Sequence, residues 1–159
     1  MEESRLIKSL GGIYTSIYDI DLATERYYEL SSFNIVRERI GKEGDVREKL
    51  EYFVSNMVVP SFIPEIRDFV NLDTLNERMR GKKRIYTEYL SPRFLNTTSI
   101  KTEQWTRCSF IEGERDEENN LLSVFFAVEA IHSDKIKELE ALKKEKEYNK
   151  SPLVHRVVG

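Results

Sequence analysis

Asp19 and Asp21 are the residues whose spacing most resembles an acid–base catalytic pair. They lie two positions apart in a segment of alternating residues, so in a strand both carboxylates share one face. Paired carboxylates are what general acid–base catalysis requires. Both also adjoin a polar turn at residues 21–25, where aspartate commonly bonds to the backbone. We favour the turn interpretation, and catalysis by Asp19, Asp21 or a buried Glu88 is the alternative.

A run of basic residues is the second candidate for chemistry, because clustered cations suit a phosphate group. The run consists of Arg78, Arg80, Lys82, Lys83 and Arg84. It surrounds Gly81, where a helical pattern ends, and cations at a helix C-terminus complement the helix dipole. We therefore favour a structural role over phosphate binding.

Cysteine and histidine are too sparse to indicate a metal site. Cys108 is the single cysteine, and the two histidines, His132 and His155, are far apart from it and from each other. No zinc spacing, dinucleotide fingerprint or phosphate-binding loop is present. Cys108 alternates with Phe110 in a strand pattern, which predicts a small buried side chain rather than a reactive thiol. The sequence assigns no cofactor and no metal.

Composition indicates a globular protein and does not favour binding to nucleic acid. The 159 residues carry 25 basic and 28 acidic side chains, a net charge of −3, which lacks the basic footprint of duplex binding. A single cysteine fits the reducing cytosol. The acidic N-terminus is unlike a secretion signal, and no apolar run approaches the ~20 residues of a membrane span. We expect a soluble cytoplasmic protein.

Two kinds of periodicity divide the chain. A period of two predicts strands, and a helical period predicts helices in the middle, where Asp45 is placed to cap the first. The expected strands are residues 12–22, 26–31, 85–90, 103–114 and 121–131, with helices at 2–10, within 45–81 and at 133–148, and a loop at 91–100. Short helices with one apolar stripe need a common surface, so we expect an α+β fold with helices covering one face of a sheet.

The order of these elements resembles a PAS domain, and is similar to the PAS-like segments that precede GGDEF diguanylate cyclase or histidine kinase output domains in bacterial signalling proteins. The resemblance spans about residues 13–142 and is carried by residues 12–22, 28–32, 40–45, 75–83 and 124–128. The family commonly ends its last strand with Asp-Ile-Thr. Here Ala130, Ile131 and His132 stand at those positions, so the family's coupling through that aspartate is not implied.

The resemblance implies a five-stranded antiparallel sheet with helices on one face, flanked by an N-terminal helix and a C-terminal signalling helix. The expected parts are residues 1–11, a sensory domain at 12–132, a linker helix at 133–150 and a tail at 151–159. The implied function is sensory input or dimerisation in bacterial signal transduction. Expected partners are a small-molecule ligand, a second copy of the chain and an output domain, and the chain itself is not expected to be an enzyme.

Apolar residues on the inner stripes of helices and strands are the candidates for a ligand pocket. They are Ile17, Phe53, Met57, Phe69, Leu75, Cys108, Phe110 and Phe126. Candidates for relaying a signal into the terminal helix are Ile131, His132, Ile136 and Leu139. The tyrosine-rich hairpin and Trp105 are interpreted as core or interface in preference to pocket lining.

Two alternatives to sensing stay open. One is a small α+β cavity enzyme that uses a buried carboxylate, which a raised carboxyl pKa inside a pocket would favour. The other is a structural dimerisation module with a filled interior, held together by Leu6, Ile7 and Leu10.

Overall fold

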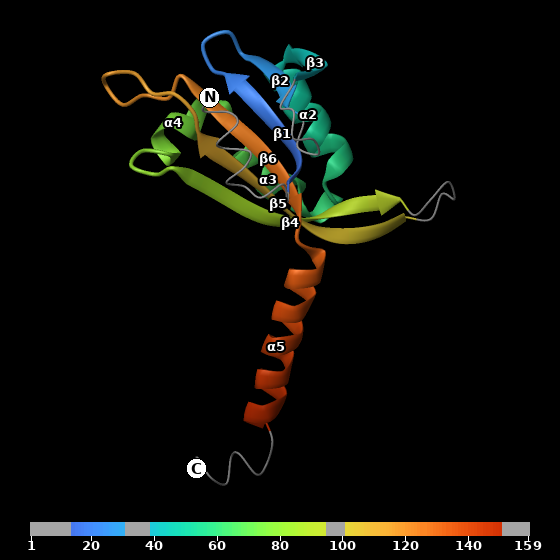
Figure 1. Ribbon diagram of the computed structural model, residues 1–159. Helices are drawn as coiled ribbons and strands as arrows, with labels where there is room; N and C mark the ends of the chain where they lie inside the picture. Colours follow the sequence, from blue (N-terminus) through green and yellow to red (C-terminus); the bar gives the residue numbers. More distant parts are fainter. Residues whose placement is uncertain (1–13, 31–38, 95–100, 151–159) are drawn as a thin grey trace.

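A six-stranded antiparallel sheet is the centre of the structure, a computed structural model that describes residues 14–30, 39–94 and 101–150 (Figure 1). The strands lie in the order β3 (Arg39–Asp45), β2 (Arg26–Leu30), β1 (Tyr14–Asp21), β6 (Ser123–Ala130), β5 (Lys101–Glu112) and β4 (Arg84–Phe94). The first hairpin therefore pairs with the last strand, with Tyr18 opposite Phe126. This closure places β6 in the middle of the sheet, as its nearly continuous apolar sequence predicts.

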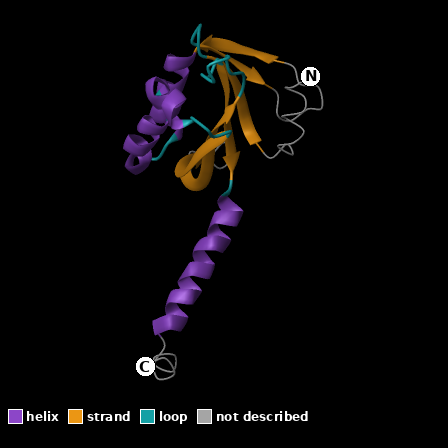
Figure 2. Ribbon diagram, turned by 90° about the vertical axis from the view of Figure 1, so that its left-hand side faces the viewer, coloured by secondary structure: helices purple, strands orange, loops and turns teal. Residues whose placement is uncertain are grey.

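The helices of the middle segment cover one face of this sheet (Figure 2). They are α2 (Val46–Met57), α3 (Ile63–Phe69) and α4 (Leu75–Arg78), joined by two 3-10 turns, Pro60–Phe62 and Leu72–Thr74. Asp45 caps α2 as predicted, because its carboxylate accepts a hydrogen bond of 2.9 Å from the backbone N–H of Glu48. Gly81 follows α4 with a φ of +72°, a conformation that glycine adopts without strain.

The predicted sheet differs from the observed one in its number of strands. The sixth strand is β3, which among the described strands pairs only with β2 and so forms an edge of the sheet. Its sequence is charged and contains two glycines, so it lacks the apolar alternation by which strands are recognised. The loop expected at residues 91–100 is wrong for residues 91–94, because β4 extends to Phe94, and its remaining residues lie outside the described ones. Pro92 is tolerated there since β4 is the other edge of the sheet.

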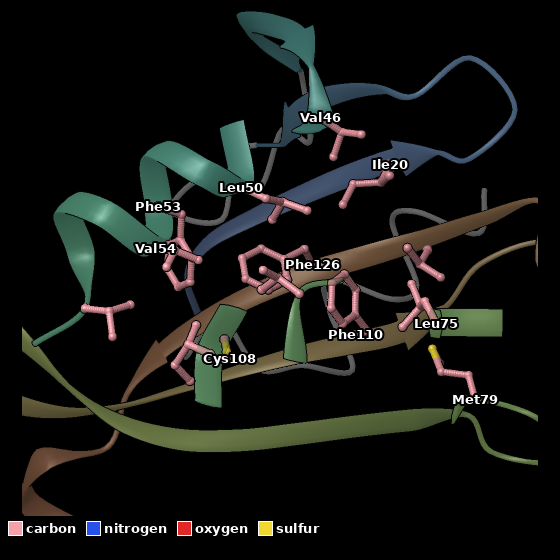
Figure 3. Close-up of a cluster of buried hydrophobic side chains, with 14 of the residues drawn as sticks. Ile20, Val46, Leu50, Phe53, Val54, Leu75, Met79, Cys108, Phe110 and Phe126 are labelled. Atoms are coloured by element: carbon pink, nitrogen blue, oxygen red, sulfur yellow. The ribbon is translucent and has the colours of Figure 1, made fainter. Parts of the chain in front are cut away.

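The main core lies between the helices and the sheet (Figure 3). Phe53 of α2, Phe110 of β5 and Phe126 of β6 meet at its centre, with ring centroids 5.2 Å apart for Phe53–Phe126 and 5.0 Å for Phe110–Phe126. Burying each such ring contributes about 1.5–3 kcal/mol. A smaller cluster on the opposite face contains Ile17, Leu30 and Ala127. The sheet thus buries apolar residues on both faces.

The terminal helix α5 (His132–Lys150) begins directly after β6 and projects away from the sheet (Figures 1 and 2). It agrees with the predicted helix at 133–148 to within two residues. Within the described ranges, no helix combines the length and apolar character needed to cross a bilayer. The helix predicted at residues 2–10 lies outside the described residues.

Candidate functional site

A cavity of about 290 Å³ opens between α2 and the sheet. Its walls are mainly aromatic and aliphatic, with side chains from α2 and from five of the six strands. Its apolar lining includes Tyr18, Tyr27, Phe53, Tyr89, Phe126 and Val128. Mostly apolar walls with a few polar groups are typical of small-molecule sites.

Aromatic stacking holds the walls in place. The Phe53 ring meets Tyr89 edge-on at 5.9 Å and Phe126 edge-on at 5.2 Å, while Tyr18 stacks over Phe126 at 6.5 Å. Burial raises the pKa of the Tyr89 phenol and of the Tyr18 phenol, with a hydrogen bond to Ser16 opposing the shift at Tyr18. Both phenols are therefore neutral at physiological pH and present hydroxyl groups rather than charge.

Polar groups gather at two places in the cavity wall. On β4 and β5 the hydroxyls of Ser91 and Thr106 lie 2.7 Å apart, and Thr106 also donates to the carbonyl oxygen of Gln104 at 3.2 Å. On α2 the Lys49 ammonium lies 5.3 Å, 5.6 Å and 5.8 Å from the ring centroids of Tyr18, Tyr27 and Tyr52. The hydroxyls of Ser91 and Thr106 thus have hydrogen-bond partners within the protein. Lys49 instead presents a positive charge at the cavity.

The eight pocket candidates from the sequence divide into three groups. Phe53, Met57 and Phe126 line the cavity. Phe69, Leu75, Cys108 and Phe110 lie in the main core without reaching the cavity wall. Ile17 lies on the opposite face of the sheet, because Tyr18 and Ile20 point toward the helices and neighbouring residues of a strand diverge.

Sequence reasoning did not propose Lys49, Ser91 or Thr106, and it favoured a core or interface role for the tyrosines of the hairpin. Tyr18 and Tyr27 do pack against the main core, and they also line the cavity. Their places follow from the hairpin register, in which Asp19 pairs with Tyr28 and Ile20 with Tyr27. Lys49 precedes the buried Leu50 on α2 and so lies at the edge of the apolar stripe of this helix. That position was the one feature of the sequence that could have indicated a place for Lys49 at the cavity.

The three candidate catalytic carboxylates do not meet in the cavity. Asp21 accepts hydrogen bonds from the N–H groups of Ala23 and Thr24 at 2.9 and 3.1 Å, which matches the turn interpretation. Neither Asp19 nor Glu88 belongs to the cavity lining. Hydrogen bonding from Arg107 is the main cause that holds the pKa of Glu88 below its usual range, against the opposing effect of burial.

The basic run is engaged with the protein itself at three positions. Arg78 donates to the carbonyl oxygens of Phe69 and Asn71 at 2.8 and 2.9 Å, Arg80 pairs with Glu77, and Arg84 donates to Ser109. Over the described residues, three or more His, Cys, Asp and Glu side chains do not come together in a way that could hold a metal ion.

A polar cluster on the far face of the sheet fastens the start of α5. The Lys135 ammonium lies 3.0 Å from Glu88 and 5.1 Å from the ring centroid of Trp105. The Arg107 guanidinium lies 2.7 Å from the carboxylate of Glu88 and 3.1 Å from that of Glu129, so it links the two. We call Glu88, Arg107, Glu129 and Lys135 the junction cluster.

The backbone of β5 completes this junction. Trp105 accepts a hydrogen bond of 3.0 Å from the N–H of Ile131, and its own N–H donates to Nδ1 of His132 at 3.1 Å. Of the four relay candidates, Ile131 is buried and His132 half-buried at this joint, whereas Ile136 and Leu139 are exposed along α5. The first two thus contact β5, and the other two face solvent.

Comparison with known proteins supports the fold. No protein-family model matches the chain, and no curated protein matches it significantly. A crystal structure of a sensory box histidine kinase/response regulator from Burkholderia thailandensis E264 is similar over 91% of this chain and 96% of that chain, with a TM-score of 0.50 and 13% sequence identity. The chain therefore has a PAS-like α+β fold, which confirms the resemblance seen in the sequence at the level of fold.

Proposed function

We propose that this chain is a sensory input module of a signalling protein, which binds a small molecule in the α2 cavity and passes the change to α5. The PAS-like fold and its likeness to a sensory box protein support the general role. The cavity and the junction cluster support the proposed route of the signal, from a ligand in the cavity to α5.

One feature of β5 carries the proposal. Within residues 104–107, Gln104 and Thr106 line the cavity on one face of the sheet. On the other face, Trp105 contacts His132 and Lys135 at the start of α5, and Arg107 is linked to Lys135 through Glu88. Side chains of a strand alternate between faces, so a displacement of this segment acts on both sites at once. A ligand that prefers one position of β5 would therefore bias the position of α5.

Homodimerisation through α5 is part of the proposal. Ile136, Leu139 and Leu142 are spaced three apart and are 36%, 40% and 48% exposed. Apolar residues at this spacing form one stripe along a helix, which a second α5 would cover. We assign residues 12–132 to the sensory domain and 133–150 to the linker helix, with residues 1–11 and 151–159 flanking them. The output domain would be a diguanylate cyclase or histidine kinase, acting in the cytoplasm.

The enzyme alternative needs a buried carboxylate at the cavity, and the positions of Asp19, Asp21 and Glu88 give it no support. The structural alternative needs a filled interior, whereas the cavity of about 290 Å³ could accept a ligand. An engineered cavity of about 150 Å³ is enough for benzene.

Native mass spectrometry of freshly purified protein, followed by ligand-observed NMR with a metabolite library, tests ligand binding. Val128→Trp fills the cavity from β6, and Leu122→Trp at an exposed position away from the cavity is the matched control. We expect compounds that bind the parent protein and Leu122→Trp but not Val128→Trp. Equal binding to both variants would place the site elsewhere, and no binding to any of them would favour the structural module.

A further inference from the structure

The Lys49 ammonium is a charged group at the cavity that pairs with no carboxylate among the described residues. Every ion pair found there that involves α2 uses Arg47 or Glu51, so none involves Lys49. Other half-buried cations have partners: Lys135 meets Glu88 at 3.0 Å, and Arg115 meets Glu112 at 2.7 Å. Arg78 is also half-buried and has no ion pair among the described residues, but its guanidinium donates to the carbonyl oxygens of Phe69 and Asn71. Lys49 has neither kind of partner there, in a protein whose acidic residues outnumber its basic ones.

Three tyrosine rings surround Lys49 instead of a carboxylate. A ring face attracts a cation by about 0.5–1 kcal/mol at exposed sites and about 2 kcal/mol or more where it is desolvated. These contacts hold the ammonium at the cavity without neutralising it. An ionised partner would add a charge-assisted hydrogen bond, which is about twice as strong as a neutral one.

Gly44 on β3 leaves space for one of these rings, that of Tyr27. A Cβ added at Gly44 would lie 3.2 Å from Cε1 of Tyr27, which is tighter than ordinary contact. Glycine on β3 therefore leaves room for the Tyr27 ring beside Lys49. Tyr18, which shares an edge-on contact of 5.8 Å with Tyr27, keeps its hydroxyl proton because burial raises its pKa.

The rest of the cavity suits an uncharged body. Phe53, Tyr89, Phe126 and Val128 line it, and its volume of about 290 Å³ is about twice that of a cavity that accepts benzene. One aromatic ring with a short side chain, or a short alkyl chain, fits this space.

We propose that the cavity selects small organic carboxylates with an apolar aromatic or aliphatic body, and that Lys49 is the residue that determines this selectivity. The carboxylate pairs with the Lys49 ammonium, and the body lies against Phe53 and Phe126. This inference rests on the proposed function, since it names the ligand class of the same cavity.

Calorimetric titration with matched pairs of probes tests the inference. Benzoate, phenylacetate and hexanoate are the anionic probes, and benzamide, phenylacetamide and hexanamide are their neutral counterparts. The parent protein should bind at least one acid ~10-fold or more tightly than its amide. Lys49→Met, which keeps the stem but removes the charge, should abolish that preference, and Lys49→Arg should retain it. Lys143→Met, at an exposed position on α5, is the matched control and should change nothing.

The possible results separate the inference from the proposed function. Amides that bind as well as acids, or acid binding unchanged in a folded Lys49→Met protein, would overturn the carboxylate assignment and leave ligand sensing in place. No binding of either series to the parent protein would overturn the assignment, and a metabolite library without binders would then also remove the sensing role. The circular dichroism and melting temperature of each variant show that it is folded.

Discussion

Replacement of Lys135 by methionine should loosen the start of α5 without unfolding the sheet. Lys135 Nζ lies 3.0 Å from Glu88 and 5.1 Å from the Trp105 ring, and its side chain is only 16% exposed. Methionine retains an apolar stem of similar length but lacks the charge, so the change removes these two interactions. It also removes a 3.8 Å ion pair with the exposed Glu138, which contributes little.

The size of the effect follows from these contacts. A hydrogen bond to a charged group contributes about 1.5–3 kcal/mol, and the lower end applies because Glu88 keeps its 2.7 Å contact with Arg107. The cation–π contact adds about 0.5–1 kcal/mol. The start of α5 should therefore lose about 2 kcal/mol of local stability, which corresponds to a factor of about 30.

Amide hydrogen exchange followed by NMR measures this loss residue by residue. The N–H at position 135, which donates to the carbonyl oxygen of Ile131 at 2.8 Å, should exchange about 30-fold faster in Lys135→Met. Amides of β1 and β6 should be unchanged, and the matched control Lys143→Met should behave like the parent protein. Unchanged exchange at position 135, or an equal increase across the whole sheet, would refute the role of the junction cluster.

Two further predictions concern titratable side chains. Because the pKa of Glu88 is lowered in the folded protein, chiefly by Arg107, its contribution to stability is full above the ordinary pKa of a glutamate and is lost as the pH falls through the lowered value. The difference in unfolding free energy between parent protein and Glu88→Gln should shrink on acidification, and a difference independent of pH would contradict this. Cys108 is fully buried and burial raises its thiol pKa, so a thiol reagent at pH 8 should label it in urea and hardly at all in native protein. Rapid labelling of native protein would show that this part of the core opens.

The change in periodicity along the chain was sufficient to predict the layers of the fold. Apolar residues at helical spacing in α2 and the nearly continuous apolar run of β6 are local patterns that burial imposes directly. The capping role of Asp45 could also be predicted, because a capping residue bonds to N–H groups of the helix that directly follows it. The edge strand β3 could not be predicted, since its charged sequence with two glycines has no apolar alternation.

The site was only partly predictable, because it depends on how α2 lies over the first hairpin. Phe53 and Phe126 follow from their stripes, but the choice between Ile17 and Tyr18 depends on which face of β1 meets the helices. No local pattern settles that choice, as both faces of the hairpin carry large side chains. Lys49 and Lys135 resemble ordinary surface lysines in the sequence, and their roles arise from contacts with Tyr18 and Glu88 far away in the chain.

The central claim is that occupancy of the cavity changes the attachment of α5. The most direct measurement is hydrogen exchange at residues 131–139 with and without a saturating cavity ligand, phenylacetate or a compound identified by mass spectrometry. The account predicts an altered exchange rate there in the parent protein and none in Val128→Trp, whose cavity is filled. A ligand that protects the cavity walls of the parent protein while residues 131–139 exchange at an unchanged rate would contradict it.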